Sequence, residues 1–281
     1  MKIGFCALSW MEPTDAPDHG WFAELKAIGY DGIEIPVIHG AKEAYVRLGA
    51  ALDKAALKRT ALTVMPPGTN PVSDDDKQRA AGMDHIAWAL DTAHAMGAEM
   101  LVGPIHQTLG VFTGKPPSSI EFARLATFHR RAGEIAAPLG MRVAVEPMNR
   151  FECHMLNRMD TLSRHLEAVG HPAVTALYDT FHANVEESDP VAALTRNMAS
   201  VGHFHVSEND RGIPGTGHVP WAATYAALKK GGYDGWITVE AFGLDVPAFA
   251  AVASVWRDIP EGRSELARRS FQHIRDGWAA A

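Results

Sequence analysis

The sequence predicts an α/β fold, and more narrowly a single (β/α)8 barrel domain spanning residues 1–281. Apolar runs typical of β-strands alternate along the chain with segments of helical apolar spacing, which is the pattern of a closed parallel barrel. The length of 281 residues suits one such barrel, since these domains take about 250 residues. No linker or low-complexity stretch divides the sequence. A doubly wound open sheet is the alternative, but no Gly-x-Gly-x-x-Gly follows the first predicted strand.

Eight short apolar runs are the predicted strands. In chain order they cover residues 2–8, 31–35, 60–65, 99–103, 141–146, 174–179, 202–206 and 235–240. The same four residues, Gly-Tyr-Asp-Gly, occur at 29–32 and again at 232–235, each time where a strand is about to begin. We interpret this repeat as a helix-to-strand turn in which glycine takes a left-handed conformation. The repeat therefore indicates architecture rather than chemistry.

Helix boundaries can be predicted where capping residues stand beside helical apolar spacing. Ser118 and Glu121 form a capping-box pattern ahead of a long helix. Asp160 is the predicted N-cap of a second helix, which Gly170 should end. The acidic run at 73–76 is interpreted as a helix start rather than as a second metal site, because acidic side chains are favourable near helix N-termini.

Composition narrows the class of protein. Hydrophobic residues make up 47% of the chain, enough for a large core, and the net charge of −7 argues against a nucleic-acid binder, which usually carries a basic patch. The two cysteines, Cys6 and Cys153, do not suggest a disulfide framework. No apolar run reaches the length of about 18 residues typical of a membrane span. The first residues read as a strand rather than as a signal segment, so we expect a reduced, cytoplasmic location.

Four polar residues stand at the ends of the last four predicted strands: Glu146, Asp179, His205 and Glu240. Because side chains alternate between the two faces of a strand, all four can point into the barrel at its C-terminal mouth, where barrel enzymes keep their sites. Each residue alone is explained by an ordinary structural ion pair. Together, three carboxylates and an imidazole suit one divalent cation, Mn²⁺ foremost, or Mg²⁺ or Co²⁺. His203 lies one layer deeper and is predicted to be a hydrogen-bonded barrel residue.

The segments around these residues carry a family resemblance. They read Glu-Pro-Met-Asn-Arg-Phe-Glu at 146–152, Tyr-Asp-Thr-Phe-His-Ala-Asn at 178–184, His-Val-Ser-Glu-Asn-Asp-Arg at 205–211 and Thr-Val-Glu at 238–240. In order and spacing the set resembles the ketose 3-epimerases, which include the D-tagatose and D-allulose (psicose) 3-epimerases, within the xylose isomerase-like TIM-barrel superfamily. The resemblance is specific in the C-terminal half of the chain and only generic in the N-terminal half.

The resemblance implies a metal-dependent isomerase that inverts C3 of a free 2-ketose through a cis-enediolate. In the family, the residues that match Glu146 and Glu240 are both metal ligands and the acid–base pair on opposite faces of the sugar. The residues that match Glu152, His182 and Arg211 bind the substrate. Family members form dimers or tetramers, so a homo-oligomer is also implied. The expected partner is a small sugar, with no nucleic acid and no membrane.

Other functions stay open on the sequence alone. An aldose–ketose or hydroxypyruvate-type isomerase, or a metal-dependent polyol dehydratase, would begin with a similar proton removal on the same barrel. An apurinic-site endonuclease would need a basic groove, against which the net charge argues. A non-catalytic sugar-binding protein is conceivable, because fold does not fix function. The choice of sugar depends on the ends of the first four strands, where Trp10, Met65 and His106 are candidate pocket residues.

Overall fold

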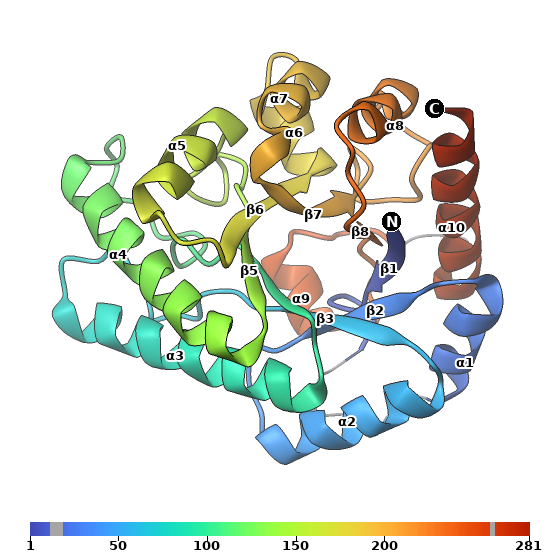
Figure 1. Ribbon diagram of the computed structural model, residues 1–281, viewed down its shortest axis with the longest axis horizontal. Coiled ribbons are helices and arrows are strands. Elements are labelled where there is room, and N and C mark those ends of the chain that lie inside the picture. Colours follow the sequence, from blue (N-terminus) through green and yellow to red (C-terminus); the bar gives the residue numbers. More distant parts are fainter. Residues whose placement is uncertain (12–18, 259–261) are drawn as a thin grey trace.

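The computed structural model describes residues 1–11, 19–258 and 262–281, and within these ranges eight parallel strands close into a barrel ringed by helices (Figure 1). Each strand pairs with its neighbour in chain order, and β8 pairs with β1. The strands are β1 (Lys2–Cys6), β2 (Gly32–Pro36), β3 (Lys58–Leu62), β4 (Met100–Gly103), β5 (Arg142–Val145), β6 (Val174–Asp179), β7 (Val201–Val206) and β8 (Trp236–Val239). The predicted barrel and all eight predicted strands are confirmed, with small shifts at the strand ends.

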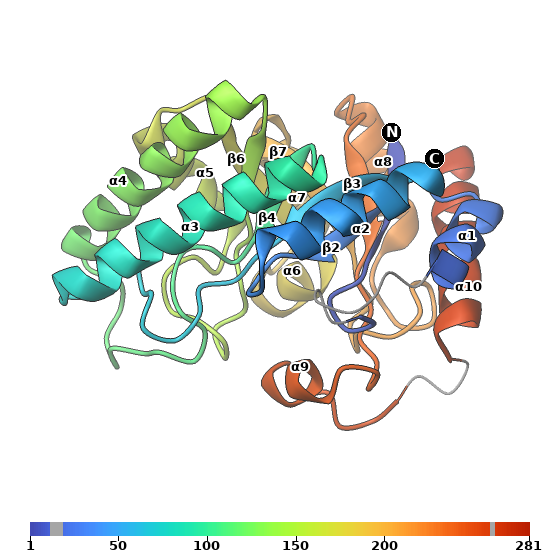
Figure 2. The same ribbon diagram turned by 90° about the horizontal axis from the view of Figure 1, so that it is seen from below.

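Helices cover the outside of the barrel. They are α1 (His19–Ile28), α2 (Lys42–Lys54), α3 (Asp76–Met96), α4 (Ser119–Ala136), α5 (Met159–Val169), α6 (Thr180–Glu186), α7 (Pro190–Arg196), α8 (Trp221–Lys230), α9 (Pro247–Val252) and α10 (Gly262–Ala280), with short 3₁₀ turns η1 (Ala137–Leu139) and η2 (Met198–Ser200). Helix α10 packs against α8 and α1 and so closes the ring. Figure 2 shows α9 standing apart, on the same side of the barrel as α6. None of the helices in the described ranges combines the length and apolar character that crossing a membrane requires.

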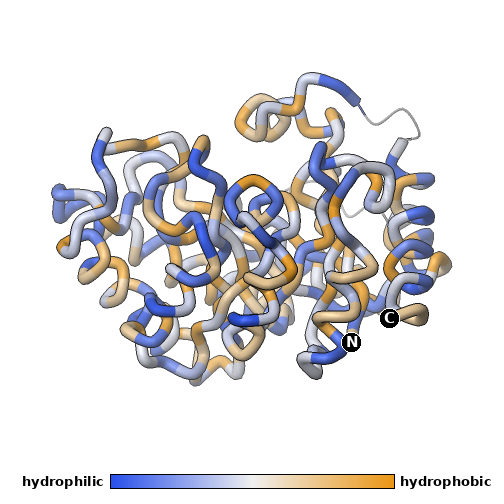
Figure 3. The backbone as a smooth tube through the Cα atoms, turned by 90° about the horizontal axis from the view of Figure 1, so that it is seen from above, coloured by the Kyte–Doolittle hydropathy of each residue, from blue (hydrophilic) through white to orange (hydrophobic). Residues whose placement is uncertain are grey.

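Alternation along the strands separates the core into two layers. Outward-pointing side chains such as Val143, Val145 and Ile237 belong to the large cluster between the strands and the helices. The inward-pointing side chains form a smaller cluster within the barrel and above it, made by Cys6, Leu8, Leu62, Met100, Val102, Ala144, Leu177 and Phe242. Figure 3 shows hydrophobic and hydrophilic positions alternating around the outer helices, clearly so in α10. The two faces of the strands thus carry separate clusters, as alternation along a strand requires.

Several local signals act as predicted. Ser118 Oγ accepts from the backbone N–H of Glu121, and the Glu121 carboxylate accepts from the backbone N–H of Ser118, which completes the capping box of α4. Helix α3 begins after Asp75, whose side chain caps it. The two Gly-Tyr-Asp-Gly repeats are turns in which Gly29 and Gly232 have φ of 122° and 71°, a region that only glycine enters freely.

The predicted N-cap of α5 is wrong. The cap position is Arg158, which makes no capping hydrogen bond with its side chain, although Gly170 ends the helix in the left-handed conformation as predicted. Asp160 lies in the first turn and accepts instead from Asn197 Nδ2 at 2.8 Å. The Asp160 carboxylate thus bonds to Asn197, a residue distant in sequence, instead of capping the helix as the local sequence predicts.

Candidate metal centre

The four predicted ligands converge at the C-terminal mouth of the barrel. Glu146, Asp179, His205 and Glu240 each offer one donor atom, and these atoms lie within 4.8 Å of one another. Asp179 of β6 and His205 of β7 are direct neighbours across the strand pair. Glu146 and Glu240 directly follow β5 and β8, and the backbone N–H of each still donates to the adjacent strand at 3.0 Å. Hydrogen bonds between the strands therefore fix the backbone position of each of these four residues.

The spacing of the donor atoms fits a cation better than a hydrogen-bonded cluster. His205 Nδ1 lies 3.4 Å from Glu240 Oε1, 3.6 Å from Asp179 Oδ2 and 3.8 Å from Glu146 Oε1. His205 Nδ1 and Glu146 Oε1 are both buried and have no hydrogen-bond partner among the described residues. A divalent cation about 2.1 Å from each donor would bring such atoms to about 3 Å from one another. The residues present thus fit one hard divalent ion.

The electrostatics of the cluster point the same way. Burial raises the pKa of Glu146 well above its usual range, and the negative charge of Glu240 raises it further. Burial also raises the pKa of Glu240, against the opposing effects of Arg211 and His205. Burial acts in the same direction on Asp179, but there the positive charge of Arg211 prevails and lowers the pKa. Burial and the neighbouring carboxylates thus disfavour the charged forms of Glu146 and Glu240, which a divalent cation would stabilise.

Arg211 contacts this cluster as a cationic side chain. Its Nη1 donates to Asp179 Oδ2 at 3.2 Å and also to Glu240 Oε2, while its Nη2 lies 3.0 Å from His182 Nε2. The guanidinium sits between two aromatic rings, 4.0 Å from the centroid of Phe181 and 4.5 Å from that of Phe242. The two stacked rings and the carboxylates hold the guanidinium plane in one orientation.

The backbone at Arg211 is strained. Its φ of 61° lies in the left-handed region, which is unfavourable for a residue with a side chain. The surrounding loop maintains this conformation, because Arg211 N–H donates to the Glu208 carbonyl at 3.0 Å and Arg211 carbonyl accepts from Phe242 N–H at 2.9 Å. The buried Glu208 carboxylate in turn accepts from three backbone N–H groups and from Trp221 Nε1. The loop is therefore built to present Arg211 to the cluster.

His182 faces Arg211 as a second hydrogen-bond donor. Its Nδ1 accepts from the backbone N–H of Asn149 at 3.1 Å, so in the neutral ring the proton lies on Nε2. Burial and the nearby Arg211 lower the pKa of His182 to about 3, which keeps the ring neutral. Nε2–H and the Arg211 guanidinium are then two donors facing each other. A ligand oxygen that lies beside this pair, within hydrogen-bond distance of both nitrogens, would accept from both.

The three predicted substrate-binding residues form one connected group. Asn149 Nδ2 donates to Glu152 Oε1 at 2.6 Å and lies 3.1 Å from His182 Nδ1, and His182 lies against Arg211. Sequence reasoning missed Asn149, although it stands inside the segment at 146–152 that carried the family resemblance. Its amide links two residues of the predicted set, and this role cannot be seen from spacing.

Sequence reasoning also missed Glu34, in the middle of β2. Glu34, His203 and His205 form a second close group of potential ligands, and His203 Nε2 lies 3.0 Å from Glu34 Oε2 inside the barrel. The predicted hydrogen bonding of His203 is not confirmed, because neither ring nitrogen has a hydrogen-bond partner among the described residues. Glu34 also accepts from Thr60 Oγ1 and from His205 Nε2. Both of its carboxylate oxygens thus have partners, unlike the ring nitrogens of His203 within the described part of the chain. The available signal was a charged residue at an inward position of an apolar strand.

The candidate pocket residues lie buried in the loops after β1, β3 and β4. Trp10 Nε1 donates to the carbonyl of Ala241, the residue after Glu240, at 2.9 Å. Met65 pairs with the loop after β4 through an isolated bridge. His106 is fully buried, and its Nε2 lies 3.8 Å from Cys153 Sγ. Burial raises the pKa of the Cys153 thiol to about 12, so this thiol stays protonated and unreactive.

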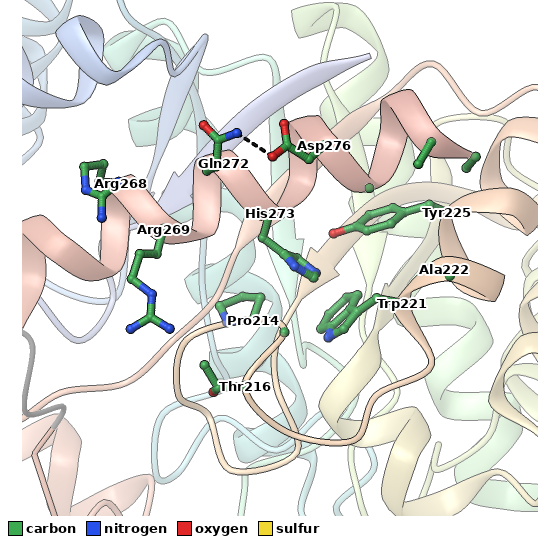
Figure 4. A pocket seen from close by; sticks show the side chains of 14 residues that line it. Pro214, Thr216, Trp221, Ala222, Tyr225, Arg268, Arg269, Gln272, His273 and Asp276 are labelled. Atoms are coloured by element: carbon green, nitrogen blue, oxygen red, sulfur yellow. Dashed lines mark hydrogen bonds between the residues drawn. The ribbon is translucent and has the colours of Figure 1, made fainter.

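A cavity of about 590 Å³ lies away from this cluster, between α10, the start of α8 and the loop after β7 (Figure 4). Trp221, Tyr225 and His273 line it on one side, and Arg268 and Arg269 approach it from α10. The residues that line it include none of the four predicted ligands. Its size alone therefore does not make it the candidate active site.

Comparison with known proteins gives a consistent family. The family model described as "Xylose isomerase-like TIM barrel" matches residues 22–276. The chain is 27% identical over 275 residues to the "Probable ketose 3-epimerase" of Synechocystis sp., covering 98% of this chain and 96% of that protein. It is 27% identical over 279 residues to the ketose 3-epimerase of Arthrobacter globiformis, with the same coverage. The crystal structure of D-allulose 3-epimerase from Methylomonas sp. in complex with D-allulose has a TM-score of 0.90, at 27% identity, covering 98% of this chain and 96% of that chain.

Proposed function

The chain belongs to the xylose isomerase-like TIM-barrel family, and from this premise we propose that it is a metal-dependent epimerase that inverts C3 of a free 2-ketose. The resemblance to ketose 3-epimerases predicted from the strand-end segments, and with it the isomerase class, is confirmed by the relatives. The observation that carries the finer proposal is the meeting of Glu146 and Glu240 in one cluster with Asp179 and His205. The solved relative with D-allulose supports a free ketose as the substrate class.

The same four residues, Glu146, Asp179, His205 and Glu240, would hold the cation. Three carboxylate oxygens and one imidazole nitrogen favour Mn²⁺, with Mg²⁺ and Co²⁺ as the next choices. When bound, the ion supplies Lewis acidity that polarises the C2 carbonyl and so acidifies the proton on C3. The carboxylates themselves need no stronger basicity than they have, because the substrate proton is made easier to remove.

The two glutamates divide the proton transfer between the two faces of the sugar. One carboxylate removes the proton from C3, which gives the enediolate, and the carboxyl group of the other delivers a proton to the opposite face. Two groups are needed, because a single base would mostly return the proton to the face it left. After one turnover the first group has gained a proton and the second has lost one, so both exchange with water before the next cycle. Ligation to the cation would lower the basicity of both carboxylates, and the cation would compensate by acidifying the substrate proton.

We assign substrate binding to Glu152, His182 and Arg211. The facing donors of His182 and Arg211 suit the C1 and C2 oxygens, one of which gains negative charge when the C3 proton leaves. Asn149 orients the Glu152 carboxylate, which can accept a hydrogen bond from a sugar hydroxyl. Stacking of Arg211 between Phe181 and Phe242 keeps the guanidinium in place before substrate arrives, which lowers the ordering needed on binding.

The proposal is tested by following hydrogen exchange at individual carbons. Mn²⁺-loaded protein in ²H₂O is incubated with D-fructose, D-tagatose and L-ribulose in turn, and the products are followed by NMR. We expect deuterium at C3 together with the 3-epimer, and loss of both signals with EDTA. Exchange at C1 with formation of an aldose would replace the proposal with an aldose–ketose isomerase. Absence of exchange with all three ketoses would reject a free ketose as substrate.

A further inference from the structure

Glu34 is a buried carboxylate for which the proposed proton transfers have no use. It lies in the middle of β2, faces the barrel interior and is 0% exposed. A carboxylate kept from water is strongly destabilising unless donors surround it. Its neighbours in register are Cys6 of β1 and Thr60 of β3, so it sits one level below the strand ends that carry the proposed ligands.

The two oxygens of Glu34 have separate partners. Oε2 accepts from Thr60 Oγ1 at 2.8 Å and lies 3.0 Å from His203 Nε2. Oε1 lies 2.9 Å from Nε2 of His205. These contacts fix the carboxylate plane from one side and leave one oxygen for His205 alone.

The contact decides how the His205 ring can be used. A neutral imidazole has one N–H and one lone pair, and an ionised carboxylate can only accept. With Glu34 at Nε2, the proton belongs on Nε2 and the lone pair on Nδ1, which is the atom that faces Glu146, Asp179 and Glu240. A ring nitrogen that carries a proton cannot ligate a cation, so the nitrogen that faces the cluster must be the one with the free lone pair.

We propose that Glu34 is a positioning residue for metal binding: it accepts the Nε2–H of His205, holds the ring, and directs the Nδ1 lone pair into the cluster of Glu146, Asp179 and Glu240. This inference rests on the proposed metal site. It adds a residue from the opposite half of the barrel whose effect is on cation affinity, through His205, rather than on the sugar.

Metal affinity measured separately from turnover tests the proposal. Protein stripped with EDTA is titrated with Mn²⁺ by calorimetry, as wild type, Glu34→Gln and Thr60→Val. Removing an outer carboxylate of this kind typically weakens metal binding about 10–100-fold, and we expect that loss in Glu34→Gln. Thr60→Val is the matched control, since it removes a donor to the other oxygen of Glu34, and we expect less than about a threefold change. The wild type should bind one ion per chain, in the cluster of Glu146, Asp179, His205 and Glu240.

The outcomes separate the two levels of the argument. If the wild type does not bind Mn²⁺, the metal-dependent function itself is rejected. If the wild type binds and Glu34→Gln binds within twofold of it, with equal melting temperatures of the stripped proteins, only the role of Glu34 is rejected. Two ions per chain would assign the second to Glu34 and His203 and would also overturn the positioning role.

A second measurement does not depend on the variant folding. Wild-type protein with ¹⁵N-labelled histidine is loaded with diamagnetic Mg²⁺, and the protonated nitrogen of each ring is identified by NMR, with His205→Asn assigning the signal. We expect the proton of His205 on Nε2, in hydrogen-bonded form. A proton on Nδ1 would overturn the proposal.

Discussion

The two halves of the barrel contribute to the candidate centre in opposite ways. In the C-terminal half, each of β5 to β8 carries one of the four proposed ligands at or directly after its end. The loops after β5 and β7 add Glu152 and Arg211, and helix α6 adds His182. In the N-terminal half, Glu34 is the residue of β1 to β4, as far as these strands are described, that belongs to a group of potential metal ligands. It lies in the middle of β2 rather than at a strand end.

The difference lies in which polar atoms are already satisfied. Among the described residues, Glu146 Oε1 and His205 Nδ1 at the mouth are buried without a hydrogen-bond partner, whereas both oxygens of Glu34 have partners. The proposed ligands Glu146 and His205 thus present unmet hydrogen-bonding capacity to a cation, whereas Glu34 holds one of these ligands in place. Changes in the C-terminal half should affect chemistry, and changes elsewhere should affect affinity or stability.

The largest effect is expected from removing one of the two proposed proton carriers. Glu240→Gln keeps the size of the side chain and removes both the base and the negative ligand, so epimerisation should fall by at least about 10³-fold. Initial rates of 3-epimer formation with saturating Mn²⁺ measure the change. Glu167→Gln on the exposed face of α5 is the matched control and should leave the rate unchanged. A Glu240→Gln enzyme within tenfold of wild type would remove Glu240 from the mechanism.

Removing the cation should lower the stability of the folded protein. An ion present at 100 times its dissociation constant stabilises the folded protein by about 2.7 kcal/mol, which corresponds to roughly 5–10 °C in a chain of this size. We therefore expect EDTA to lower the melting temperature by that amount, and excess Mn²⁺ to restore it. Scanning calorimetry of the same sample before and after Mn²⁺ is added back is the measurement. Equal melting temperatures would mean that the four residues do not bind the ion in the folded state.

Arg211 should affect the substrate more than the metal. Arg211→Lys keeps the charge but loses the planar group that reaches His182 while stacked between Phe181 and Phe242. We expect kcat/KM to fall about 10–100-fold, the loss of 1.4–2.7 kcal/mol of transition-state binding, with Mn²⁺ affinity within about threefold of wild type. Steady-state kinetics and calorimetry on one preparation distinguish the two effects. A large loss of Mn²⁺ affinity with kcat/KM preserved at saturating metal would instead assign Arg211 to the metal site.

The fold and the four metal-ligand candidates could be predicted because both leave local signals. Alternation within short apolar runs defines strands, and a charged residue that ends such a run, as Glu146 and Asp179 do, stands out against it. Parallel strands then bring these ends together without any further information. Short helices such as α6 and α9 leave no periodic apolar pattern of their own, and they were not predicted.

The supporting contacts could not be predicted, because they depend on partners far apart in the sequence. Glu34 is 171 residues from His205, and within its own strand it reads as a single polar interruption. Asp160 reads as a helix cap, but Asn197 lies close enough in space to take its carboxylate. The sequence therefore predicts the position of a polar residue in its strand or helix. The packing of distant elements decides which group becomes its hydrogen-bond partner.

The outer layer should respond to pH through stability rather than through chemistry. His129 of α4 and His165 of α5 lie 2.9 Å apart in the packed seam between these helices, and burial lowers the pKa of His165 to about 4. The unfolded chain takes up a proton near pH 6.5 and the folded chain only near pH 4, so this contribution to stability is present above pH 6.5 and is lost as the pH falls from 6.5 to 4. The slope from one such group is at most about 1.4 kcal/mol per pH unit.

A variant pair isolates this effect from that of the other histidines. His165→Gln should flatten the decline of the melting temperature between pH 6.5 and 4 relative to wild type, whereas His94→Gln, at the exposed C-terminal turn of α3, should leave the decline unchanged. Thermal melts at half-unit pH steps are sufficient. Identical slopes for wild type and His165→Gln would show that this histidine pair does not carry the acid sensitivity.

The smallest effect is expected at the capping box of α4, which lies away from the cluster. Ser118→Ala removes the Oγ that accepts from the Glu121 N–H and leaves a helix-end donor without its partner. Such changes cost about 1 kcal/mol, so the melting temperature should fall by roughly 2–4 °C. Ser119→Ala, one residue further along and equally exposed, makes no cap and should change stability by less than about 0.5 kcal/mol. Because α4 only supports the barrel from outside, kcat and Mn²⁺ affinity should stay at wild-type values in both variants, and a loss of either in Ser118→Ala would show that the outer layer takes part in shaping the mouth.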